Sequence, residues 1–409
     1  MIKKGLCVRC KGKLLCDLGY CPILASYSAK TKLKKYFDKE MEGASPTSVF
    51  VSWQDYPKVT VGALATANEG DVAFYDIPEQ WYGISAERIV EMRSSLLMAA
   101  QRFNVNSASS PNQTLQKIQE LTMSSSDVEV SVELEKLPEP KLSFCGYFGP
   151  MGPKAPMKKI ELAANPKIDR KVEYITNDTD AATKDALIEL YESGYRVSFL
   201  QKLLSMGLLG QGNRRKIVPT RWAITAVDST VSEQLIEEGV KQHPLIDFYE
   251  LYHSCYLEND FWVLMIPNTW AFEQLECWLP GNVWTQEERT PQIIHDHEFY
   301  NGRKNYAENV EGAYYAARLA VAEHLTKRKR QAACIVFREI SEKYAVPLGV
   351  WQIRENVRFA LKQRPLCFES LDKALELLAK KLRVSINSYI MSSEIIKYLK
   401  KQKKITEWF

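Results

Sequence analysis

The chain of 409 residues is 45% hydrophobic and 25% charged, an ordinary globular composition that is long enough for two or three domains with cores of their own. Its 54 basic and 50 acidic residues nearly balance, so any nucleic-acid-binding surface must be a local feature. No apolar run reaches the roughly 18 residues that a membrane helix needs, and we expect no transmembrane helix.

The first segment, residues 1–35, is basic and holds four cysteines in the spacing C-x2-C-x5-C-x4-C: Cys7, Cys10, Cys16 and Cys21. Thiolates suit tetrahedral zinc or an iron–sulfur cluster, and the first pair followed by Gly12 resembles a zinc knuckle. The sequence therefore predicts a structural zinc site, with an iron–sulfur cluster as the alternative.

The start is too polar for a signal peptide, and the odd total of nine cysteines argues against a disulfide framework, so we expect a cytoplasmic protein.

Apolar periodicity predicts the next elements in chain order: strands near 48–64, a helix over 86–103, a helix over 114–123 capped by the turn before it, a strand over 127–135, two helices between 180 and 207, and a strand at 221–227. Thr230 and Glu233 fit a capping box, which predicts a helix that starts at 228–230 and runs through Lys241.

In the second half the pattern predicts a hairpin over 245–267 with its turn at 258–260, the longest helix over 310–341, a strand pair over 346–361 and an amphipathic helix over 370–382. No βαβ series is visible, so the expected fold class is α+β, or mixed α/β. We expect four parts: the four-Cys module at 1–35, an α+β domain at 36–265, a second α+β domain at 266–390 and a flexible tail at 391–409.

Two local basic segments are candidate contacts to DNA phosphates. The first contributes Arg214, Arg215 and Lys216, shortly before Trp222, which offers a surface for base stacking. The second is the run of Lys327, Arg328, Lys329 and Arg330, expected to continue a helix. The alternative for both is an ordinary solvated surface.

A further polar set surrounds the sequence HDHEFYNGRK. His295 and His297 lie on one side of an extended strand, which suggests a metal site, but spacing identifies no third ligand, and a polar loop is the alternative. Five residues, which we call the five polar candidates, are the best prediction for a catalytic site: Arg221, Asp228, Glu298, Arg303 and Lys304. They could instead form an Arg–carboxylate bracket between domains.

The chain ends in QKKITEWF, in which Gln402, Ile405, Trp408 and Phe409 have the spacing Q-x-x-h-x-x-a-a. On one helical turn the last three share a face. This resembles the PIP box, the peptide by which replication and repair proteins dock on the sliding clamp PCNA. The alternative is a final helix that packs on its own fold, but the preceding KYLKKQKK is too polar to favour burial.

Together the four-Cys start, the stretches 216–232 and 302–325 and the terminal peptide resemble the archaeal Nre family. The resemblance implies a role in the response to DNA damage with PCNA as partner, and it supplies no reaction to map onto residues. The chain is then either a clamp-recruited DNA-binding or adaptor protein, or a clamp-recruited enzyme acting on DNA or a nucleotide. A central pocket lined by the five polar candidates would favour the enzyme, whereas closed ion pairs between the domains would favour the adaptor.

Overall fold

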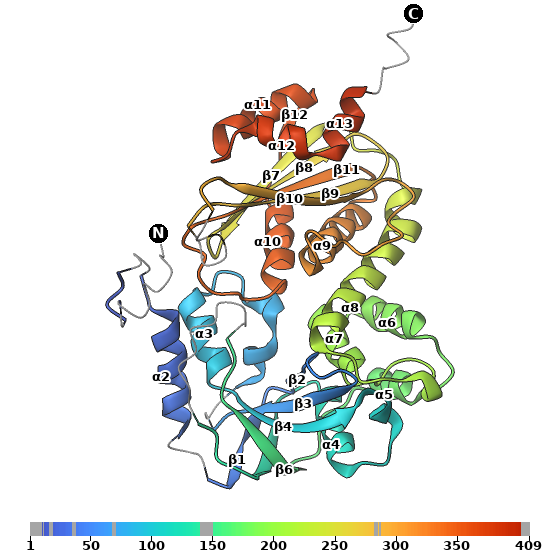
Figure 1. Cartoon of the computed structure of the whole chain (residues 1–409). Helices are drawn as coiled ribbons and strands as arrows, with labels where there is room; N and C mark the ends of the chain where they lie inside the picture. The colour runs from blue at the N-terminus through green and yellow to red at the C-terminus, as the bar shows by residue number, and fades with distance from the viewer. Residues whose placement is uncertain are drawn as a thin grey trace, which may run out of the picture.

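A computed structural model describes residues 10, 12–15, 19–34, 38–67, 71–139, 150–281, 285 and 288–401 of the chain. Two six-stranded sheets and the helices around them form a mixed α/β fold, as the sequence predicts. Figure 1 shows the first sheet in the lower part of the molecule and the second in the upper part, with helix α8 (Thr220–Gln234) running between them. None of the described helices is long and apolar enough to span a membrane.

The first sheet has the strand order β1-β5-β6-β4-β3-β2. Its strands are β1 (Glu40–Ser45), β2 (Val49–Val51), β3 (Lys58–Ala65), β4 (Leu97–Asn104), β5 (Val128–Leu134) and β6 (Lys154–Leu162). Only the β4–β6 pair is parallel. The helices of this half are α2 (Pro22–Lys34), α3 (Ala86–Ser94), α4 (Gln113–Met123), α5 (Arg170–Asn177), α6 (Thr183–Glu192), α7 (Val197–Ser205) and α8. Val61, Leu203 and Val227 belong to one core, so the sheet and the later helices fold around the same apolar centre.

The second sheet has the order β10-β9-β11-β8-β7-β12. Its strands are β7 (Tyr249–Tyr256), β8 (Asn259–Ile266), β9 (Ala271–Trp278), β10 (Gln292–Glu298), β11 (Ala333–Ile340) and β12 (Leu366–Phe368). Helices α9 (Gly312–Arg328) and α10 (Trp351–Lys362) cover one face, and α11 (Leu371–Lys381), α12 (Ile386–Ser392) and α13 (Glu394–Lys401) cover the other (Figure 1). Each covered face has its own core, so β11 is buried at every position.

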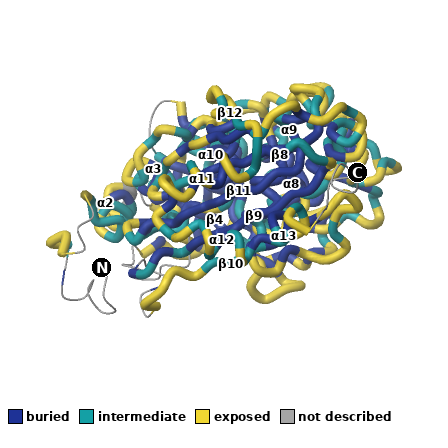
Figure 2. The backbone as a smooth tube through the Cα atoms, turned by 90° about the horizontal axis from the view of Figure 1, so that it is seen from above, coloured by how far each residue is buried: buried dark blue, intermediate teal, exposed yellow. Residues whose placement is uncertain are grey.

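Contacts between the two halves are apolar as well as polar. Trp81 of the first half meets Trp351 at the start of α10 edge to face, with ring centroids 5.1 Å apart. The Tyr256 hydroxyl donates to the carbonyls of Trp81 and Ile84 at 2.6 and 2.5 Å. Figure 2 shows the buried backbone running through the middle of the molecule with the exposed segments around it.

Several predicted elements are confirmed, among them strands β2, β3 and β5, helices α4, α6, α7 and α11, and the β7–β8 hairpin. Asn112 caps α4, since its side chain accepts the N–H of Leu115 at 2.9 Å. The hairpin turn lies one residue earlier than predicted, because Leu257 and Glu258 take the positive φ angles of 52° and 60°.

Two predicted helices are too long. The first ends at Ser94, and the apolar run that follows is strand β4. The second ends at Arg328, since Lys329 adopts a left-handed conformation with φ 54°, and strand β11 begins at Ala333. A strand buried on both faces has a continuous apolar sequence, which does not differ in pattern from a buried helix.

Two predicted strands are helices. The strand predicted at 221–227 is part of α8, whose buried Ala223, Val227 and Val231 recur every fourth residue. The capping box at Thr230 is therefore wrong, because Thr230 lies inside this helix. The strand pair predicted over 346–361 is α10, which buries Ile353 and Val357 with the same spacing.

Two predicted boundaries also differ from the structure. The one at 265/266 falls within β8, and the second sheet already begins at Tyr249 because β7 and β8 pair with β11 and β12. The tail was expected to be flexible from 391, but α13 runs to Lys401 and buries Ile395 and Ile396 against the second sheet. Its two isoleucines bury one face, although the opposite face is rich in lysine. Residues 402–409 lie outside the described part of the chain.

Candidate functional site

Asp228, one of the five polar candidates, is enclosed between helices. Arg354 of α10 donates from Nη1 to both of its carboxylate oxygens at 2.9 Å, and Gln201 of α7 donates to Oδ1 at 3.1 Å. Burial raises the pKa of Asp228, and Arg354 opposes that rise. The carboxylate is fully buried and its partners come from both halves, so it joins the halves rather than facing a substrate.

Glu298 and Arg303 lie close together beside the ring of Tyr314. Glu298 accepts from Arg318 of α9 at 2.7 Å and from the indole of Trp270 at 3.0 Å. Arg303 donates to the carbonyl of His297 at 2.7 Å and to Asp296 at 3.0 Å. The guanidinium carbons of Arg303 and Arg318 lie 5.1 and 5.8 Å from the Tyr314 ring centroid. Both candidates are thus held in closed ion pairs.

The remaining two candidates are at the surface. Arg221 pairs with Glu311 at 2.6 Å, and both side chains are more than half exposed. Lys304 is exposed as well.

A cavity of about 310 Å³ lies elsewhere, near the β7–β8 turn, and none of the five polar candidates lines it. Its lining residues are Cys255, Tyr256, Leu257, Glu258, Asp260, Glu339, Ser341 and Arg383. The five do not converge on one pocket. The ion pair of Asp228 with Arg354 is closed and joins the two halves, whereas those of Glu298 with Arg318 and of Arg303 with Asp296 lie within the second half.

The first basic segment forms a loop, residues 210–219, that we call the basic loop. Arg215 points inward, and its guanidinium donates to the carbonyls of Gly210, Thr176 and Asp178 at 2.7, 2.7 and 2.6 Å. Arg214 and Lys216 on either side of it are exposed. Two of the three cations predicted to contact phosphates are therefore exposed, while Arg215 holds the loop in place.

The second basic segment does not continue a helix, because α9 ends within it. Arg328 forms a bidentate pair with Glu250 and also donates to the hydroxyl of Tyr252 at 2.9 Å. Arg330 donates to the carbonyl of Lys329 at 3.1 Å. Cations in the last helical turn also complement the helix dipole. Only Lys327 and Lys329 in this run are exposed without an ion pair to another described residue.

The exposed rings of Tyr56 and Trp222 meet beside the basic loop, and together with the exposed Trp53, three residues before Tyr56 in the chain, we call them the aromatic patch. Trp53, Tyr56 and Trp222 are 47%, 50% and 45% exposed, and the rings of Tyr56 and Trp222 are 5.3 Å apart. The Thr220 hydroxyl accepts the N–H of Val51 at 2.9 Å, which joins the start of α8 to the end of β2. The sequence predicts base stacking for Trp222. It does not single out Trp53 and Tyr56, although the segment SWQDYPK contains both aromatic residues.

Val105 links the aromatic patch to the basic loop. Its N–H donates to the carbonyl of Pro57 at 2.9 Å, and its carbonyl accepts from the N–H of Ile217 at 2.8 Å. The exposed Lys216 and the exposed Tyr56 are each one residue away from these bonds, and Lys58 is exposed on the same turn. Exposed cations thus lie next to exposed aromatic rings, a combination that suits the phosphates and bases of single-stranded nucleic acid.

The other predicted sites lie partly outside the described residues. Cys10 is buried and its Sγ accepts the N–H of Leu15 at 3.3 Å, and Cys21 is half-buried just before α2. Cys7 and Cys16 are outside, as are Gln402, Ile405, Trp408 and Phe409. His295 and His297 do lie on one side of β10, and there they meet Glu273 of β9.

Two family models match most of the chain: archaeal Nre, N-terminal, over residues 15–285, and archaeal Nre, C-terminal, over residues 298–408. DNA repair protein NreB of Archaeoglobus fulgidus is 35% identical over 96% of this chain and 97% of its own length. DNA repair protein NreA of the same organism is 39% identical over 90% of this chain and 92% of its own length. DNA repair protein NreA of Haloferax volcanii is 36% identical over 84% of this chain and 83% of its own length. No solved structure matches the chain.

Proposed function

The chain belongs to the archaeal Nre family, and from that premise we propose that it is a DNA repair protein that binds DNA on its own surface and reaches the sliding clamp PCNA through its C-terminal peptide. The names of its relatives, DNA repair proteins NreA and NreB, support the repair role. The closed ion pair of Asp228 with Arg354, which joins the two halves, supports an adaptor rather than an enzyme.

The observation that carries the DNA-binding part is the exposed contact between Trp222 and Tyr56 beside the basic loop. Large apolar rings exposed together on a surface are costly unless they have a ligand, and the faces of nucleobases suit them. Arg214, Lys216 and Lys58 supply cations for the phosphates around the rings. Because stacking does not require a particular base, we expect binding of single-stranded DNA with little sequence preference.

The test is equilibrium binding of a fluorescently labelled DNA single strand to the full chain. We expect Trp222→Ala to weaken binding by about 1–3 kcal/mol, roughly 5- to 150-fold, for the loss of one stacked base. Tyr398→Ala removes an exposed ring on α13, which packs on the second sheet, and serves as the control. Wild-type affinity in a folded Trp222→Ala, Tyr56→Ala double variant would remove the aromatic patch as a DNA site.

Recruitment to PCNA is proposed from the sequence of the last eight residues. Gln402, Ile405, Trp408 and Phe409 match the anchor positions of a PIP box, and the peptide follows directly on α13. Because α13 is held to the second sheet by Ile395 and Ile396, the peptide would start from a fixed point and dock into a groove of the clamp. DNA held at a second site would strengthen this docking through effective concentration.

We also propose that Cys7, Cys10, Cys16 and Cys21 bind a structural zinc ion, with an iron–sulfur cluster as the alternative. The N–H bond to Cys10 Sγ and the burial of this sulfur support a ligand role. A zinc ion would order a segment that is too short for a core of its own. Elemental analysis of freshly purified protein tests the proposal: replacing Cys7 and Cys10 by Ser should remove one zinc per chain, whereas iron with labile sulfide would indicate a cluster.

A further inference from the structure

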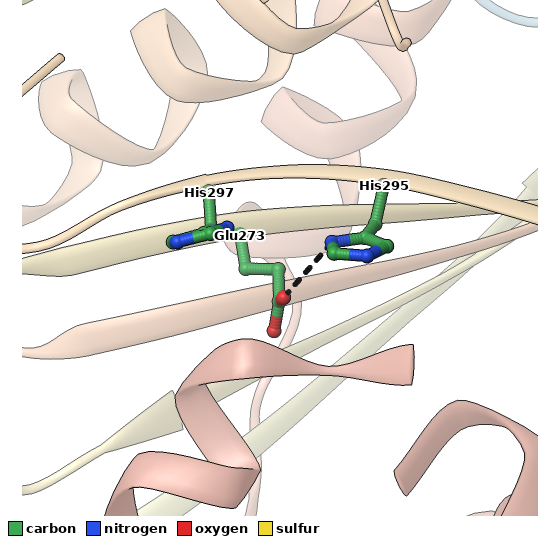
Figure 3. A group of neighbouring side chains, drawn as sticks. All are labelled: Glu273, His295 and His297. Carbon is green, nitrogen blue, oxygen red and sulfur yellow. Dashed lines mark ion pairs between the residues drawn. The ribbon is translucent and has the colours of Figure 1, made fainter. Parts of the chain in front are cut away.

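Three potential metal ligands meet on the face of the second sheet that α12 and α13 cover. His297 of β10 is the direct cross-strand partner of Glu273 on β9, and His295 lies two residues before His297 on the same face. Figure 3 shows both imidazoles and the carboxylate at the same place on the sheet. Antiparallel pairing thus supplies the third ligand that sequence spacing did not reveal.

The distances within this group are short. One ligand atom from each of Glu273, His295 and His297 lies within 4.8 Å of the other two. Glu273 is fully buried, and His295 Nδ1 is buried 3.5 Å from its carboxylate. This nitrogen forms no hydrogen bond within the described part of the chain.

We propose that Glu273, His295 and His297 bind one divalent transition-metal ion, with zinc as the best match. Two imidazoles and one carboxylate are a well-known set of protein ligands for zinc, which leaves a fourth tetrahedral position for water or another ligand. At bond lengths of about 2.0–2.1 Å, tetrahedral ligand atoms are roughly 3.4 Å apart. Both imidazoles are partly exposed, and the proposal requires them to rotate so that ligand atoms now within 4.8 Å of one another reach this separation.

An ion pair between His295 and Glu273 is the competing interpretation. It uses one imidazole and leaves unexplained why His297 also stands opposite the same carboxylate. The metal accounts for both histidines and for the buried His295 Nδ1, which lies 3.5 Å from the carboxylate and forms no hydrogen bond within the described part of the chain. Calcium and magnesium fit less well, because these ions prefer sites built from oxygen ligands.

The same carboxylate holds the start of α13. Glu273 accepts the N–H of Glu394 at 2.8 Å, the N–H of Ile395 at 3.4 Å and the hydroxyl of Ser393. A carboxylate has about four lone-pair positions, so it can cap a helix and bind a metal at the same time. A bound ion would fix Glu273 and with it the helix that leads to residue 401, so metal occupancy would stabilise α13 on the sheet.

The experiment compares zinc binding by the metal-free full chain and by a His295→Ala, His297→Ala variant, using calorimetric titration. We expect the variant to bind one equivalent less, whatever the number bound by the cysteines. Cobalt is a second probe, because the site of two imidazoles and a carboxylate lacks the thiolate charge-transfer band of a cysteine site. His253→Ala, which removes an exposed histidine of β7, should bind as many equivalents as the wild type.

A second, more conservative variant tests whether loss of metal binding results from misfolding. His297→Gln keeps a polar side chain of similar size on the edge strand, and we expect it to lose the same equivalent. In the wild type, zinc should slow amide hydrogen exchange over residues 394–401, and neither histidine variant should show this effect. Equal zinc stoichiometry in wild type and folded variants would overturn the proposal and leave the ion pair as the explanation.

Discussion

Arg354 donates from a single guanidinium nitrogen to both carboxylate oxygens of Asp228, at 2.9 Å each, and neither side chain is more than 1% exposed. The two residues lie 126 positions apart, on α10 and α8, and come from opposite halves of the chain. A buried pair of this kind is unfavourable to break, because the remaining charge has no water to solvate it.

We therefore expect Asp228→Asn to lower the free energy of unfolding by about 3–5 kcal/mol. The apolar double variant Asp228→Leu, Arg354→Met should recover most of this loss, since it removes both charges of the pair and Glu355, which Arg354 also approaches at 3.6 Å, keeps its ion pair with Arg358. Urea unfolding monitored by circular dichroism measures both. If Asp228→Asn were as stable as the wild type but inactive in repair, Asp228 would return as a catalytic candidate.

The basic loop contains two exposed cations that we propose as DNA contacts and one arginine with a structural role. Replacing Arg214 and Lys216 by Ala should lower the slope of log affinity against log salt by up to about 2, roughly one per lost phosphate contact, and leave stability unchanged. Arg215→Ala should instead cost at least about 2 kcal/mol of stability, because it removes three hydrogen bonds from a charged donor to carbonyls.

Lys380→Ala, Lys381→Ala on α11 is the matched control for the salt experiment, since both lysines are exposed on the second half of the molecule. The salt slope of this control should equal that of the wild type. An unchanged slope in the Arg214, Lys216 variant as well would mean that the loop is an ordinary solvated surface.

We expect His324 to make the free energy of unfolding depend on pH. Burial lowers its pKa from 6.5 to about 4, and Arg328 adds to the effect. The unfolded chain therefore binds more protons than the folded chain between these values, so stability falls as the pH drops from 6.5 towards 4, by up to about 3 kcal/mol. In His324→Gln this part of the decrease should be absent. Urea unfolding at pH 7.5, 6 and 5 compares the two proteins, and parallel curves would assign the acid sensitivity to other groups.

Trp408→Ala, Phe409→Ala should abolish binding to PCNA without affecting folding or metal content. Each anchor contributes about 1.5–3 kcal/mol when buried, so their joint loss weakens docking at least about 100-fold. Thr406→Ala, Glu407→Ala changes the same peptide between its anchors and should bind normally. Surface plasmon resonance on immobilised clamp measures both variants. Precipitation of the aromatic variant would show instead that the two rings belong to the protein's own core.

The sequence by itself determined the family, the terminal PIP-like peptide, the four-Cys spacing and those elements with one buried face. Helix α4 and strand β5 were predictable because one-sided burial leaves a clear period, of 3.6 or 2 residues, in the order of apolar and polar residues. In β11 and in the first four residues of β4, burial on both faces removes that alternation, so the sequence pattern predicts helix there.

Only the tertiary structure decided which polar residues are free and which are already bound. Arg214 and Arg215 are neighbours of the same type, yet one is exposed and the other is held by carbonyls up to 39 residues away. Glu273 became the third partner of His295 and His297 through strand register, which depends on how the whole sheet assembles. Side-chain partners of this kind are set by long-range packing, and local sequence spacing does not contain them.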